Sequence, residues 1–143
     1  MIVNAVIKFP VMQITPKFIM GSILNEGQLL TVGEQNLRKG CFNDCYIVDS
    51  DGNKFKVISA HISKRERVFR LLNIFPLYRI VKVDIELSDA KKTDLDDFKN
   101  EVVAKIKKNK WMKSSYESES EVFQHLYEAK SFEDLICRVG IYN

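Results

Sequence analysis

The alternation of apolar and polar residues is clearest in the middle of the chain. Within Leu77–Leu87, apolar residues occupy every second position from Val81 onward, and charged residues fill the positions between them. Successive side chains of a β-strand point to opposite faces of its sheet. The pattern therefore predicts a long strand with one polar face.

Two β-rich runs flank a turn sequence earlier in the chain. Cys45–Asp49 and Lys54–His61 are separated by four residues that include Gly52. Glycine can adopt the positive φ that a tight turn requires, so this segment predicts a β-hairpin. Ile58 lies on the otherwise polar face of the second strand, and we expect that it needs partial cover.

The first forty residues carry shorter strand signals. Ile2–Phe9 alternates as a strand and stops before a proline, and Ser22–Val32 is typical of further strand material interrupted by a turn at Asn25–Gly27. Glu34–Lys39 predicts one helical turn, which Gly40 ends. Together with the later strands, these segments predict four to six strands in one antiparallel sheet.

The last third of the chain has apolar residues at helical spacing. Thr93 can cap a helix that runs to about Lys108, Ser118–Glu121 forms a capping box, and Ser131 can cap a last helix. Between the two long strands, Lys64–Phe75 forms either a short amphipathic helix or a wide connection. These signals predict two or three C-terminal helices.

The order of these elements, strands first and helices last, predicts an α+β fold. We expect a single antiparallel sheet of four to six strands packed against two or three C-terminal helices. No internal repeat, low-complexity tract or linker divides the chain, so residues 1–143 are predicted to form a single α+β domain.

Composition narrows the class of protein. The chain has 143 residues, of which 45% are hydrophobic and 29% are charged, which is typical of a globular protein. Its 22 basic and 19 acidic residues give a net charge of +3, and so small an excess does not indicate nucleic-acid binding. No apolar run approaches the roughly 20 residues of a membrane span. Three cysteines and the absence of a leader pattern predict a reducing, cytoplasmic location.

Four residues invite a metal or catalytic interpretation. Cys41 and Cys45, with His61 or His125, could supply zinc ligands, but zinc modules usually present two tight ligand pairs. A cysteine nucleophile with a histidine base would use the same residues, yet no specific signature surrounds Cys41. We therefore predict no metal, no cofactor and no catalytic residue. Cys45 is expected to be a small apolar strand residue, and Cys137 a core residue of the last helix.

The clustered carboxylates have structural explanations. Asp94, Asp96 and Asp97 stand at a helix start, where the helix dipole and free N–H groups favour negative charge. Asp49 and Asp51 surround a glycine turn but lack the later ligands of a calcium loop. The glycines are isolated and no Gly-Lys-Ser/Thr sequence exists, so nucleotide binding has no support.

Two stretches are candidates for contact with a partner. Arg65, Arg67 and Arg70 form a basic patch with aromatic residues that could contact RNA, a membrane surface or an acidic protein. Trp111 and Tyr116 lie in a polar connection, where aromatic residues can anchor a protein interface. The alternative for Trp111 is that it folds back to seal the core.

The turn Asp49–Gly52 and the closing helix Lys130–Ile136, in a short chain of this layout, give a resemblance to a known class. The chain resembles immunity proteins of bacterial polymorphic-toxin, contact-dependent inhibition or type VI secretion systems. The resemblance implies a non-catalytic protein that binds a cognate toxin domain and blocks its active site or a required surface. A pI near 8.7 departs from the acidic inhibitors of cationic nucleases, which puts a nuclease target in doubt.

Three functional hypotheses remain open. The first is the toxin-binding immunity protein. The second is an RNA- or membrane-associated accessory domain that uses the basic patch, with binding that weakens as salt rises. The third is an enzyme of unfamiliar type, which would need a pocket joining Cys41 with His61 or His125. Exposed sheet edges also permit a homodimer.

Overall fold

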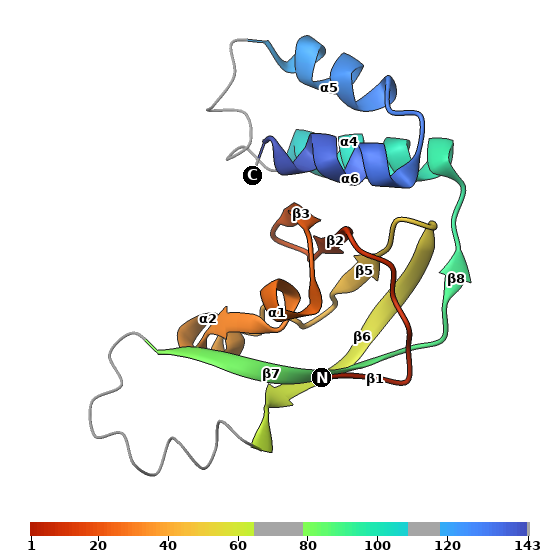
Figure 1. The fold of residues 1–143 in the computed structure, drawn as a ribbon. Helices are drawn as coiled ribbons and strands as arrows, with labels where there is room; N and C mark the ends of the chain where they lie inside the picture. Colours follow the sequence, from red (N-terminus) through yellow and green to blue (C-terminus); the bar gives the residue numbers. More distant parts are fainter. Residues whose placement is uncertain (65–78, 109–117, 143) are drawn as a thin grey trace.

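A computed structural model describes residues 1–64, 79–108 and 118–142 (Figure 1). The strands are β1 (Ile2–Val3), β2 (Val11–Ile14), β3 (Ile19–Ile23), β4 (Thr31–Gly33), β5 (Tyr46–Val48), β6 (Asn53–Ile62), β7 (Ile80–Leu87) and β8 (Lys91–Lys92). The helices are α1 (Glu26–Leu29), α2 (Glu34–Arg38), α4 (Leu95–Lys108), α5 (Glu119–Tyr127) and α6 (Phe132–Gly140). The sheet has the order β1-β7-β6-β5-β2-β3, with β4 on β7 and β8 on β6. The predicted α+β class, with C-terminal helices on the sheet, is confirmed.

The sheet differs from the expected one in its first strand. β1 pairs with β7 in parallel, so the sheet is mixed, and the described residues form eight strands, two of which have only two residues. Val83 N donates to Leu30 O at 2.9 Å and Ile85 N donates to Met1 O at 3.0 Å, from the same side of β7. β4 and β1 therefore pair with the same edge of β7, one after the other along its length.

The N-terminal prediction was wrong in its extent. The strand expected over Ile2–Phe9 ends at Val3, because Asn4 turns the chain with a φ of 67°. The sequence pattern also missed β2, whose four residues are all buried. Both faces of β2 are covered, so it lacks the alternation that marks a half-exposed strand.

The segment Ser22–Val32 is not continuous strand. It contains the end of β3, the short helix α1 and most of β4. Asn25, for which a turn is predicted, is instead the N-cap of α1. Its Oδ1 accepts a hydrogen bond from Gln28 N at 2.9 Å. The helical turn expected at Glu34–Lys39 is confirmed as α2, and Gly40 ends it with a φ of 77°.

The predicted hairpin is confirmed as the antiparallel pair β5 and β6. Gly52 in its turn has a φ of 79°. The carboxylate of Asp49 is buried and accepts hydrogen bonds from Asp51 N at 3.0 Å and Asn53 N at 2.9 Å, so its structural role is also confirmed. The cover expected over Ile58 is not found, because this side chain is 59% exposed.

The predicted long strand is confirmed as β7, with its apolar side buried and its charged side partly or fully exposed. Residues 77 and 78, which were expected to begin it, lie outside the described residues, and so does the segment 65–75 for which a helix or a connection was expected.

The three C-terminal helices are confirmed, but two of their caps differ from the prediction. Asp94, not Thr93, caps α4, because its Oδ2 accepts hydrogen bonds from the backbone N of Asp96 at 3.1 Å and of Asp97 at 3.2 Å. Ser118 precedes α5 without a side-chain cap. The predicted cap of α6 is present: the hydroxyl of Ser131 accepts from Asp134 N at 3.1 Å.

Two hydrophobic clusters lie on opposite faces of the sheet. The first packs α4, α5 and α6 against β2, β3 and β5 (Figure 1). The second fills the other face, below α1 and the segment around Phe42. Cys45 is fully buried in this second cluster, as expected. Cys137 was expected in the core and is exposed, because it lies on the outer side of α6.

Candidate binding pocket

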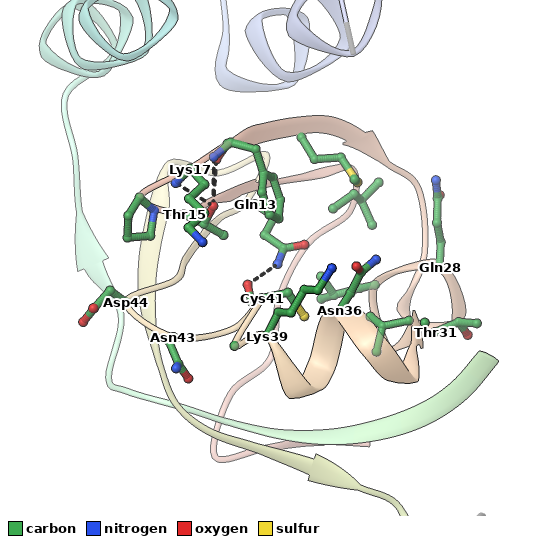
Figure 2. Close-up of a pocket in the computed structure, with 18 residues that line it drawn as sticks. Gln13, Thr15, Lys17, Gln28, Thr31, Asn36, Lys39, Cys41, Asn43 and Asp44 are labelled. Atoms are coloured by element: carbon green, nitrogen blue, oxygen red, sulfur yellow. Dashed lines mark hydrogen bonds between the residues drawn. The ribbon is translucent and has the colours of Figure 1, made fainter. Parts of the chain in front are cut away.

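A pocket of about 640 Å³ lies on the sheet face opposite the C-terminal helices. The β2–β3 hairpin forms one side, and α1, β4, α2 and the segment after α2 form the other (Figure 2). Pockets of roughly 300–1,000 Å³ are the usual size for ligand sites. It is therefore the strongest candidate binding site in the described part of the chain.

The alternation of β2 places a polar side chain in this pocket. Met12 and Ile14 pack toward the C-terminal helices, so Gln13 between them points to the opposite face. Gln13 pairs across the hairpin with Met20, which also lines the pocket. The Gln13 side chain is buried, and its Nε2 lies 3.5 Å from Cys41 O, at the outer limit of a hydrogen bond. The Gln13 side chain also forms a hydrogen bond with the thiol of Cys45, so its amide lies between the segment after α2 and β5 at the floor of the pocket.

The opposite wall comes from α2 and its C-terminal end. Asn36 and Lys39 point from this wall toward the Gln13 amide (Figure 2). Cys41 N donates to Asn36 O at 3.1 Å, which folds the chain back after α2 and keeps Cys41 beside them. Within the described residues, the side chains of Asn36 and Lys39 make no hydrogen bond or ion pair. Two side-chain amides and one ammonium group therefore face the same space, where they can form hydrogen bonds with a ligand.

The end of the hairpin is held by its own hydrogen bonds. The hydroxyl of Thr15 accepts from Phe18 N at 3.0 Å and lies 3.2 Å from Phe18 O, to which it donates. Thr15 therefore fixes the β2–β3 connection, while Lys17, in the same turn, is exposed at the pocket. The hydroxyl of Thr15 is therefore fully paired within this turn.

The thiols near the pocket are not activated as nucleophiles. Burial raises the pKa of Cys45 to about 12, and burial also raises the pKa of Cys41, which lines the pocket. A raised pKa lowers the fraction of thiolate, which is the form that acts as a nucleophile. Neither His61 nor His125 lines the pocket, and His125 lies on α5 with its Nδ1 2.6 Å from the hydroxyl of Tyr142. The structure does not bring the four candidate ligands together.

The metal interpretation finds no other support either. Across residues 1–64, 79–108 and 118–142, no group of three or more His, Cys, Asp or Glu residues is placed to hold an ion.

Alkylation should rank the three cysteines by exposure. We expect iodoacetamide at mildly alkaline pH to label Cys137 first, Cys41 more slowly and Cys45 only after unfolding, because the thiolate is the reactive form and must be reached by the reagent. Mass spectrometry of tryptic peptides over time measures the three rates. Labelling of Cys45 as fast as Cys137 in the native protein would contradict the packing of the second cluster.

The partner-binding residues expected from sequence, Arg65, Arg67, Arg70, Trp111 and Tyr116, lie outside the described residues. Their roles stay predictions.

The sequence pattern missed the three residues that converge in the pocket. Gln13 carried the only local signal, as the one polar residue in the apolar run Val11–Ile14. Asn36 and Lys39 lie in a short polar helix and its end, where no sequence feature separates a pocket wall from solvent-exposed surface.

Comparisons of the chain with known protein families, with curated proteins and with solved structures find no match. No helix in the described part of the chain has the length and apolar character needed to cross a bilayer.

Proposed function

We propose that this chain is a non-catalytic binding protein, and specifically an immunity protein that neutralises a cognate bacterial toxin by direct contact. The observation that carries the binding role is the convergence of Gln13, Asn36 and Lys39 on one open pocket. These groups donate and accept hydrogen bonds but do not form the paired nucleophile and base of a hydrolytic site.

The content of the pocket supports binding over turnover. An enzyme built on the cysteine would need Cys41 and a histidine together, and the pocket contains Cys41 alone of these. Its thiol is held in the protonated form by burial. Side chains that donate and accept hydrogen bonds, with no histidine among the described lining residues, suit a surface that binds a partner.

The more specific role, toxin neutralisation, rests on the resemblance of the turn Asp49–Gly52 and the closing helix to immunity proteins. Such a protein acts in the cytoplasm of the toxin-producing cell and needs no cofactor. Its partner is a protein domain, and an interface of standard size buries about 800 Å² on each side. The pocket would form one part of such an interface.

Growth rescue tests this proposal. The gene next to that of the chain is expressed under an inducible promoter in a host that lacks both. We expect induction to arrest growth and co-expression of the chain to restore it, because toxin and inhibitor must be made together for the producer to survive. Arrest that the chain does not relieve, or the absence of any toxic neighbour, would refute the immunity role.

A further inference from the structure

We infer that the pocket recognises a carboxylate side chain, Asp or Glu, presented on an extended peptide segment of the protein partner. This inference rests on the proposed function, because it names the chemistry of the partner at the pocket. Three features of the pocket support it: its charge, its amides and its apolar wall.

The charge of the pocket favours an anion. Lys39 points into the space and Lys17 lies beside that space. Asp44, the one acidic residue among the described lining residues, lies at the edge and away from Gln13 and Lys39 (Figure 2). The ammonium of Lys39 has no ion pair within the described residues. A carboxylate would supply that pair, and a hydrogen bond with an ionised partner is roughly twice as strong as a neutral one.

The two amides favour a peptide as the carrier of that carboxylate. Gln13 and Asn36 each offer both a donor and an acceptor, which is the set that the N–H and C=O groups of a peptide unit require. They come from opposite walls, β2 and α2, so a chain lying between them can contact both. A simple anion would accept hydrogen bonds from the two amide N–H groups but could not donate one to either amide oxygen.

The apolar wall suits the aliphatic part of such a side chain. Met20 and Val32 line the pocket, and Met20 is 43% exposed while Val32 is partly buried against the second hydrophobic cluster. Methylene groups packed there gain hydrophobic stabilisation while the carboxylate reaches Lys39.

The experiment is an NMR titration of the full chain, labelled with ¹⁵N, with three probes. These are Ac-Ala-Glu-Ala-NH₂, the matched Ac-Ala-Gln-Ala-NH₂, and glutarate. We expect the Glu peptide to shift the side-chain amide signals of Gln13 and Asn36 and the backbone signal of Cys41, with a Kd on the order of 1 mM. The Gln peptide should bind roughly tenfold more weakly, because it lacks the charge.

Two variants locate the effect. Lys39→Met should lower the affinity for the Glu peptide roughly tenfold, to the affinity for the Gln peptide. The variant should fold normally because Lys39 is exposed. Lys91→Met, the same change at an exposed position on β8 outside the pocket, should leave binding unchanged. Equal shifts with both peptides, equal binding of glutarate, or no shift at the pocket would each overturn the inference.

The two proposals fail separately. Peptide binding at the pocket without growth rescue would refute the immunity role and keep the carboxylate site. Growth rescue by the Lys39→Met variant as complete as by the original chain, together with no peptide binding, would keep the immunity role and refute the carboxylate site.

Discussion

Replacing Gly21 with alanine is expected to destabilise the protein by about 3 kcal/mol, because helix α6 lies directly on the β3 backbone at this position. A Cβ at residue 21 would stand 2.5 Å from Ile136 O and 2.7 Å from Gly140 N. Both are backbone atoms, so no side chain can rotate to make room. The helix itself would have to move off the sheet and open the first hydrophobic cluster.

Urea denaturation followed by circular dichroism measures this loss. Gly33→Ala is the matched control, since a Cβ there meets nothing closer than 3.7 Å, and its effect should stay within about 1 kcal/mol. A Gly21→Ala protein as stable as the control would show that α6 does not pack on β3 as closely as the structure has it.

Replacing Asp49 with alanine should cost about 3 kcal/mol, because its carboxylate organises the hairpin turn from a buried position. Its two oxygens accept hydrogen bonds from the backbone of Asp51 and Asn53 and from Asn53 Nδ2 at 3.1 Å. Lys8 N, in the segment before β2, also donates to it at 3.4 Å. Removal of one side chain thus leaves several donors without their acceptor in a part-buried turn.

The control for this substitution lies two residues away. The carboxylate of Asp51 pairs with Lys8 Nζ at 2.9 Å on the surface, so Asp51→Ala should have a much smaller effect in the same denaturation experiment. Asp49→Asn should recover part of the lost stability, because its amide oxygen can still accept. If the two alanine variants were equally stable, the turn would not depend on the buried carboxylate.

The elements that sequence reasoning predicted well are those with strong local signals. The hairpin around Gly52 has two β-rich runs and a turn residue, and β7 has four regularly spaced apolar residues. The helices after Thr93 have apolar residues at helical spacing, and this pattern predicts each helix even where the cap lies one residue away from the predicted position. In each case the information lies within about ten residues of the element itself.

The elements that it missed depend on distant contacts. β2 is buried on both faces, which no local alternation reveals, and β1 pairs with β7 more than eighty residues later in the chain. The same limit applies to the pocket, because Gln13 and Lys39 belong to segments that only the folded sheet brings together. A polar residue inside a buried strand was the single local clue.

The most direct test of the binding role is affinity purification of the tagged chain from its native cells, with mass spectrometry of proteins recovered at near-stoichiometric yield. The proposal predicts one protein that carries a toxin domain. The carboxylate inference predicts in addition that its recovery is unchanged with Lys91→Met and strongly reduced with Lys39→Met. Recovery of RNA or lipid in place of such a protein, or of the chain alone, would contradict the proposal.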